Sequence, residues 1–220
     1  MSLQGLRGGL ERRDPFWPAQ LAVLCAIALG VALPSHLTIG TPWLVPAVEA
    51  VLLVGLVLTT PAPPTEHDQR RRFLRIGLVG VVSAVNVISL FVLAQALLEN
   101  SKVSGRTLLE GGVILWLTAV LLFAVWFWEL DRGGPVRRLL DDERLPDFLF
   151  PTMYEEDWTP EDWRPQLVDY LYLSLVNASG FSPAETIPLT RTAKVLMSVQ
   201  TLASLTTLAV TLAYAVGNLN

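Results

Sequence analysis

Polar side chains recur at three- and four-residue steps along the last apolar segment of the chain. They are Gln200, Ser204, Thr207, Thr211, Tyr214 and Asn218. Residues at this spacing lie on one face of a helix, so one polar stripe would run through most of the depth of a membrane. Such a stripe either lines a water-filled pore or packs against another helix through hydroxyl hydrogen bonds, which is typical of helix contacts in membranes. The length of the stripe and the bulk of Gln200 and Tyr214 tip the balance towards pore lining.

A second candidate site lies just upstream, where a short apolar segment ends in a polar turn. Residues 166–176 are apolar, but a helix needs roughly 20 residues to cross a ~30 Å hydrocarbon core. The segment runs into Asn177-Ala178-Ser179-Gly180, a sequence that ends helices, followed by Phe181-Ser182-Pro183. Irregular backbone at membrane depth is stable only when it is buried in protein or lines a cavity. The pattern therefore predicts a re-entrant loop, which enters the membrane and leaves on the same side.

The residues of this region resemble, in gapless spacing, those of two-helix potassium channels and their relatives. The matching positions are Ser174, Asn177-Ala178, Glu185, Pro188, Thr190 and Lys194. In that family they belong to the pore helix, the filter and its mouth, and the start of the inner helix. The resemblance covers roughly the last quarter of the chain and implies a tetramer in which Glu185 forms an acidic ring at the pore mouth. Alone, Glu185 would cap the turn together with Thr186, and both interpretations stay open.

The filter sequence departs from that family. Where the channels have Thr-Val-Gly-Tyr-Gly, this chain has Gly180-Phe181-Ser182-Pro183-Ala184. The potassium filter stacks carbonyl rings around the ion, and its glycines adopt conformations that residues with a Cβ resist. Pro183 has a fixed φ and restricts Ser182 before it. We therefore expect the loop geometry to carry over and the potassium filter not to. The segment also resembles the C-terminal part of an uncharacterised family of bacterial multi-pass membrane proteins, which implies a location and no activity.

Composition and apolar runs indicate a membrane protein. The chain is 52% hydrophobic with a mean hydropathy of +0.47, which is typical of multi-pass membrane proteins when long apolar runs are present. Those runs predict spans at residues 17–33, 44–60, 73–98, 108–128 and 192–217. Ser83, Asn86 and Gln95 in the third span either line a cavity or bond across helices. The predicted fold class is an all-α integral membrane protein with five transmembrane helices and a short re-entrant pore-like helix and loop before the last helix.

Three regions organise the chain. Residues 1–130 form a four-helix membrane region, residues 131–165 an acidic linker rich in proline and aromatic residues, and residues 166–220 the pore-loop-like module. The carboxylates of the linker either concentrate cations near a pore or are the ordinary charges of a solvated segment. Asp169 lies in the first turn of the short helix, where the helix dipole favours an anion, so we expect it to cap that helix.

Basic residues predict the orientation in the membrane. Arg12 and Arg13, the cluster at 70–75 and the cluster at 132–138 fall at the same side of the predicted spans. The positive-inside rule places that side in the cytoplasm, and Arg191 and Lys194 agree with it. The re-entrant loop would then enter from inside, opposite to potassium channels and like glutamate-receptor pores.

The sequence offers no support for enzymatic, metal or nucleic-acid chemistry. His36 and His67 lie near loops, no Ser/His/Asp set or metal-ligand spacing occurs, and the net charge is −4. Cys25 is alone, so an intrachain disulfide is excluded, and no cofactor is implied. The expected function is a channel-like protein of the bacterial plasma membrane, a homo-oligomer with a tetramer favoured, held in a lipid bilayer and conducting small inorganic cations. The alternative is a non-conducting multi-pass protein that acts as an assembly partner or has another role.

Overall fold

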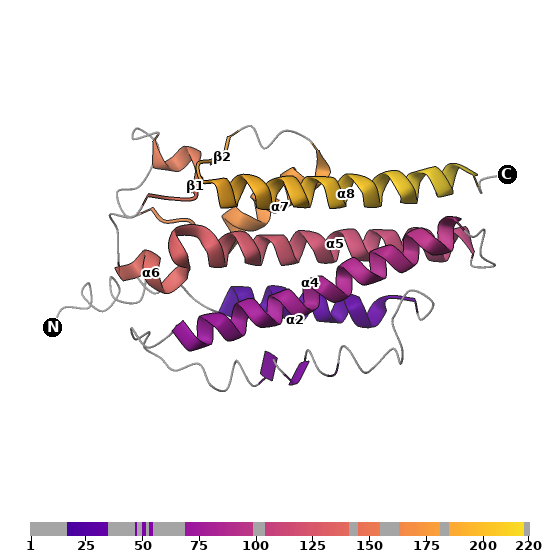
Figure 1. Cartoon of the computed structure of the whole chain (residues 1–220), viewed down its shortest axis with the longest axis horizontal. Coiled ribbons are helices and arrows are strands. Elements are labelled where there is room, and N and C mark those ends of the chain that lie inside the picture. Colours follow the sequence, from indigo (N-terminus) through magenta and orange to yellow (C-terminus); the bar gives the residue numbers. More distant parts are fainter. Residues whose placement is uncertain are drawn as a thin grey trace.

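The chain folds into a bundle of helices that lie roughly side by side (Figure 1). The computed structural model describes residues 17–34, 47, 50–51, 53–54, 69–98, 104–140, 145–154, 163–180 and 185–217. Its α-helices are α2 (Trp17–Ala32), α4 (Gln69–Leu98), α5 (Gly105–Leu130), α6 (Pro135–Leu140), α7 (Leu167–Ser179) and α8 (Arg191–Gly217). The predicted all-α fold is therefore confirmed.

Three of these helices are long and apolar enough to cross a membrane. The stretches are Arg72–Gln95, Gly105–Gly133 and Arg191–Ala213, and the shorter apolar helix Pro18–Ala32 adds a fourth apolar element. The described helices α2, α4, α5 and α8 coincide with the predicted spans 17–33, 73–98, 108–128 and 192–217. The predicted span 44–60 lies largely outside the described residues, so the number of spans is not fixed by them.

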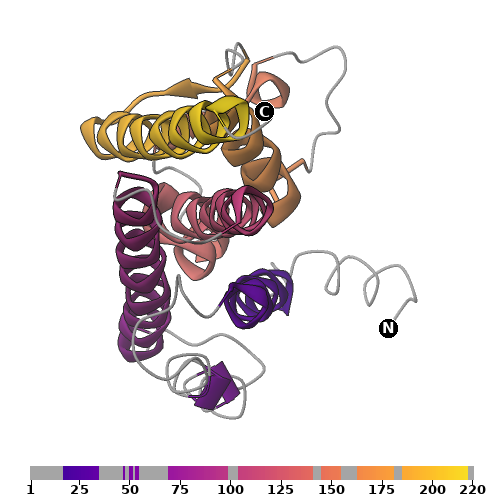
Figure 2. The same cartoon turned by 90° about the vertical axis from the view of Figure 1, so that its right-hand side faces the viewer.

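Helix α5 lies at the centre of the bundle and contacts α2, α4, α7 and α8 (Figure 2). Half of its apolar window is buried, whereas 28% is buried in the corresponding windows of α4 and α8. α5 therefore serves as the packing core, and the outward faces of α4 and α8 stay apolar and open.

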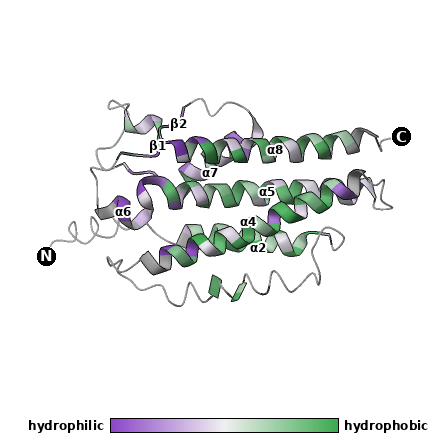
Figure 3. Cartoon of the chain, in the orientation of Figure 1, coloured by the Kyte–Doolittle hydropathy of each residue, from purple (hydrophilic) through white to green (hydrophobic). Residues whose placement is uncertain are grey.

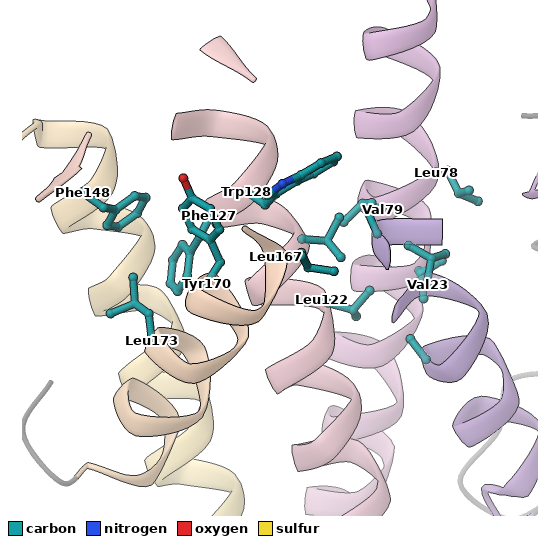
Figure 4. Packing of buried hydrophobic residues seen from close by; sticks show 14 of the residues in the cluster. Val23, Leu78, Val79, Leu122, Phe127, Trp128, Phe148, Leu167, Tyr170 and Leu173 are labelled. Carbon is teal, nitrogen blue, oxygen red and sulfur yellow. The ribbon is translucent and has the colours of Figure 1, made fainter. Parts of the chain in front are cut away.

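The main hydrophobic cluster joins α2, α4, α5, α7 and α8. Its largest side chains include Phe127, Trp128, Phe148 and Tyr170, which are at most 1% exposed. Phe127, Phe148 and Tyr170 lie together where α5 approaches α7 (Figure 4). Across α4 and α5, Trp126 Nε1 donates to Ser83 Oγ at 3.0 Å and Asn86 Nδ2 donates to the Leu115 carbonyl at 3.3 Å. These two polar residues of the third predicted span thus bond across helices.

A sharp turn follows α5 and leads into α6. Residues Asp131–Gly133 form a 3₁₀ turn, η3, and Arg132, Gly133 and Gly134 all have positive φ, of 51°, 80° and 102°. Glycine adopts such angles without the steric cost that a Cβ brings. A Cβ on Gly134 would also lie 3.1 Å from the Glu129 carbonyl oxygen. The glycine pair therefore lets the chain reverse closely around the end of α5.

The linker and the start of α8 meet in a short antiparallel ladder. Strand β1 (Phe148–Leu149) pairs with β2 (Ile187–Pro188), with Phe148 opposite Pro188, and the 3₁₀ turn η4 (Pro151–Met153) follows β1. The Phe150 ring packs edge-on against Tyr170 and Trp163, with centroid distances of 5.3 and 6.1 Å. The described part of the linker is thus folded against the ends of the helices.

Helix α7 begins at the same end of the bundle as α8 and stops halfway along it. At its end, the Ala178 carbonyl accepts a hydrogen bond from Trp116 Nε1, in the middle of α5, at 3.4 Å. A Cβ on Gly180 would lie 3.4 Å from Leu205 Cδ2, in the middle of α8. The chain returns to β2 at the starting end before α8 begins, as Figure 1 shows.

Candidate functional site

The most developed polar site lies between the end of α7 and the middle of α8. Gln200 Nε2 donates to the carbonyl oxygen of Ser174 at 2.9 Å and to its Oγ at 2.6 Å. Gln200 Oε1 accepts from Asn177 Nδ2 at 2.8 Å. Ser174 Oγ in turn donates to the Val120 carbonyl of α5 at 2.7 Å. We call Ser174, Asn177 and Gln200 the α7–α8 network.

This network is buried and its donors and acceptors are matched. Gln200 and Ser174 are 0% exposed and Asn177 is 5% exposed. Asn177 Nδ2 also donates to the Met197 carbonyl at 3.0 Å, and its Oδ1 accepts from Thr201 Oγ1 at 3.1 Å. Buried polar groups cost little when each has a partner and several kcal/mol when one is left alone. The network therefore fixes how α7 sits on α8.

Three further residues of the polar stripe face the same way, into the protein. Ser204, Thr207 and Thr211 are 1%, 4% and 8% exposed. Thr207 and Thr211 donate to carbonyls one turn back in their own helix, at 2.7 and 2.6 Å. A Cβ on Gly112 of α5 would collide with the Thr211 side chain, so α5 and α8 approach each other closely here.

Within the described chain, α5 and α7 cover the side chains of Gln200, Ser204, Thr207 and Thr211. They form a packed interface between helices, which is the second of the two arrangements that the sequence left open. Pore lining by these residues stays a prediction. Tyr214 belongs to α8, but its side chain lies outside the described residues, as does Asn218.

The structure describes both ends of the predicted filter-like loop. Asn177, Ala178 and Ser179 form the last turn of α7, and Gly180 ends it in the left-handed conformation at φ 73°. Phe181, Ser182 and Pro183 lie outside the described residues. Glu185 is exposed, and within the described part of the chain no ion pair or hydrogen bond involves it. Among the described residues, Asn177 of the loop and Gln200 of the stripe are joined by a hydrogen bond.

At the start of α7, Asp169 caps the helix as the sequence predicts. Its Oδ2 accepts the backbone N–H of Gln166 at 2.7 Å, in a capping box with the Gln166 side chain. Burial raises the pKa of the Asp169 carboxyl above its usual value, although the hydrogen bond from Gln166 acts in the opposite direction. The cap holds the first turn of α7 in place.

Two aspartates tie the ends of α5, α7 and α8 together, and the sequence reasoning missed them. Asp131 Oδ2 accepts from the Tyr170 hydroxyl at 2.6 Å, and its Oδ1 accepts the N–H of Asp147 at 2.7 Å. Asp147 Oδ1 accepts from the Thr190 hydroxyl at 2.6 Å, and its Oδ2 accepts the N–H of Arg132 at 2.8 Å. We call Asp131, Asp147, Tyr170 and Thr190 the aspartate latch. It fixes the base from which α7 and α8 both start.

Two buried arginines lie near the end of α5, and one of them contacts the latch. The Arg138 guanidinium lies over the Trp128 and Tyr170 rings, 5.5 and 5.4 Å from their centroids, and donates to the Trp128 and Asp131 carbonyls. Arg75 Nε donates to Glu129 Oε1 at 2.6 Å, in an ion pair whose side chains are 8% and 2% exposed. Ionisable groups within apolar helices are stable when they pair in this way.

Basic residues gather at the end of the bundle where α4 and α8 begin and α5 ends. This basic end, visible as hydrophilic colour in Figure 3, carries Arg72, Arg75, Arg132, Arg137, Arg138, Arg164, Arg191 and Lys194. At the opposite end, Arg106 forms an exposed ion pair with Glu110 at 2.8 Å. Across the described residues, no group of three or more histidines, cysteines or carboxylates is placed to hold a metal ion.

Comparisons of this chain with protein families, with curated proteins and with solved structures find no match.

Proposed function

We propose that this chain is a non-conducting, multi-pass protein of the bacterial plasma membrane that acts as an assembly partner of other membrane proteins. The observation that supports this proposal most is the set of hydrogen bonds around Gln200. They use both ends of its amide within one chain. The Gln200 side chain, which would have to face a pore, therefore already hydrogen-bonds to α7.

The outward face of α8 supports the same proposal. Val199, Leu202, Leu205 and Leu212 are 51%, 67%, 45% and 61% exposed. If several copies surrounded a pore through α8, this apolar face would be the one available to line it. Apolar constrictions exclude water and ions, whereas lipid or another apolar helix covers such a face without cost.

The proposed membrane arrangement has five spans and a re-entrant α7. In support, α7 starts beside the aspartate latch at the basic end and stops level with Trp116, halfway along α5. Its carbonyl end is then covered by protein, as irregular backbone at membrane depth requires. The basic end is cytoplasmic by the positive-inside rule, so α7 enters from the cytoplasm.

The assembly role draws on α4, which carries an open glycine face. Added Cβ atoms on Gly77 and Gly80 would meet nothing within 4 Å, and the two glycines lie one turn apart. Small residues let another transmembrane helix approach the backbone closely. Phe73 and Phe91, which are 72% and 61% exposed, extend the same helix surface for lipid or partner contact.

The second candidate is the channel-like function, a tetramer that conducts small cations through residues 177–185. The position of α7 favours this candidate. The helix ends at mid-depth, and β2, which follows it, lies at the end of the bundle where α7 begins, as in pore-loop proteins. Exposed Glu185 would then supply the acidic mouth. This candidate needs α8 to turn a different face to the pore.

Cation flux into liposomes that hold the purified, folded protein separates the two candidates. The proposal predicts flux no greater than in empty liposomes at any voltage. Ser204→Trp and Leu202→Trp form a matched pair, because Ser204 is 1% exposed and Leu202 is 67% exposed. Robust cation flux that falls in Glu185→Gln and in either tryptophan variant would overturn the proposal and establish a pore.

A further inference from the structure

A small cavity lies between α2, α4 and α5, close to the basic end. Its volume is about 20 Å³, and its polar lining is Gln20 from α2, Arg75 from α4 and Glu129 from α5. Val23, Val79 and Val125 supply part of the apolar wall. A cavity of roughly 10–15 Å³ is enough for one water molecule.

One polar atom of Glu129, which lines this cavity, lacks a partner. Glu129 is 1% exposed, and its Oε1 accepts from Arg75 Nε at 2.6 Å. Its Oε2 has no hydrogen-bond partner among the described residues. A carboxylate oxygen left alone in the interior costs more than a neutral group does, so the structure calls for a donor at Oε2.

We propose that the cavity binds one ordered water molecule, which donates to Glu129 Oε2 and bonds the side-chain amide of Gln20. Charge and size select water. The cavity sits beside an ion pair that is already neutral, so Arg75 disfavours a cation and Glu129 disfavours an anion. An apolar occupant would leave Oε2 without a donor. This inference does not depend on the proposed function.

The bound water completes a buried ion pair that two residues alone leave half-satisfied. Taking an ion pair out of water is repaid only when further hydrogen bonds satisfy its remaining atoms. In this account the water donates a hydrogen bond to Glu129 Oε2, as Arg75 Nε does to Oε1. Through its bond to Gln20, the water also stabilises the packing of α2 on α4 and α5.

Water-edited solid-state NMR of the full-length protein in lipid bilayers tests this site. The readout is magnetisation transfer from water to the side-chain carboxyl carbon of Glu129, whose signal is assigned by its loss in Glu129→Gln. We expect rapid transfer in the native protein and at least several-fold slower transfer in Ala19→Val, which fills the cavity. Ala28→Val, the same change on the exposed face of α2, should leave the transfer unchanged.

Absence of transfer to Glu129 in the native protein would overturn the proposal, and so would transfer in Ala19→Val at the native rate. If Ala19→Val does not fold, Gln20→Leu replaces it, since it removes one partner of the water and keeps the side-chain bulk. Slower transfer in Gln20→Leu supports the site, and native transfer in that variant contradicts it.

Discussion

Asn177, in the last turn of α7, donates a hydrogen bond to Gln200, in the middle of α8, with 2.8 Å between Nδ2 and Oε1. The two residues lie 23 positions apart in the chain. Asn177 belongs to the predicted filter-like loop, and Gln200 belongs to the stripe that the sequence predicts either to line a pore or to pack against a helix. Their contact turns both features into one interface inside a single chain.

Replacing Gln200 by leucine should destabilise the protein strongly. The change leaves Asn177 Nδ2 and the Ser174 groups with fewer partners in a site that is 0% exposed at Gln200. Three hydrogen bonds are lost, and each contributes about 0.5–1.5 kcal/mol, so we expect the free energy of unfolding to fall by a few kcal/mol. Thermal unfolding in lipid nanodiscs measures it, with Thr206→Ala on the exposed face as control. Equal stability of both variants would contradict the network.

Replacing Gly112 by alanine should separate α5 from α8. The new Cβ would collide with the Thr211 side chain, and overpacking of this kind costs about 1–3 kcal/mol. Thr211→Ala in the same protein should restore most of the stability, since it removes the colliding atoms. Gly80→Ala is the matched control, because open space surrounds Gly80. If Thr211→Ala rescues nothing in a double-mutant cycle, the close approach of the two helices is wrong.

The aspartate latch predicts different roles for two neighbouring tyrosines. Tyr170→Phe keeps the ring and removes the hydroxyl that donates to Asp131 at 2.6 Å. A hydrogen bond to a charged group contributes about 1.5–3 kcal/mol, so unfolding should become easier by about that amount. Tyr172, which is 63% exposed, provides the control Tyr172→Phe. Hydrogen exchange of the first turn of α7 should rise in Tyr170→Phe alone, and equal exchange in both variants would argue against the latch.

The buried and the exposed ion pair described on α5 should differ in how much their loss destabilises the protein. Glu129→Leu removes the carboxylate that pairs with Arg75 in the interior, where breaking a buried pair costs about 3–5 kcal/mol. Adding Arg75→Met should recover most of that loss, because the buried guanidinium is removed together with the carboxylate. Glu110→Ala breaks the exposed pair with Arg106 and should change the unfolding temperature little. A Glu129→Leu variant as stable as the native protein would show that Arg75 is not held by this pair.

Apolar runs and helix signals predicted much of the fold. The helices α2, α4, α5 and α8 begin and end within a few residues of the predicted apolar runs, and α7 occupies Leu167–Ser179, which overlaps the predicted short segment at 166–176. These features depend on local sequence, where the length and composition of a run decide the outcome.

The face of α8 could not be predicted in the same way. A stripe of Gln200, Ser204, Thr207 and Thr211 has the same spacing whether it meets water or a neighbouring helix. What decides is the tertiary contact with Gly112 and Ser174, which lie far away in the chain. The latch was missed for the same reason, since Asp131 and Tyr170 are 39 positions apart. A local signal did exist, because Asp131 ends an apolar helix just before Gly133 and Gly134.

The most direct measurement of the central claim is the reactivity of two engineered cysteines, one on α8 and one just before β2, toward a charged, membrane-impermeant thiol reagent. The protein would carry Cys25→Ser and either Thr207→Cys or Glu185→Cys, in lipid nanodiscs that expose both membrane faces. Thr207 is 4% exposed and Glu185 is exposed. We predict rapid labelling of Glu185→Cys and none of folded Thr207→Cys, because α5 covers that face of α8. Labelling of Thr207→Cys at a rate close to that of Glu185→Cys would show that the stripe faces water and would contradict the non-conducting account.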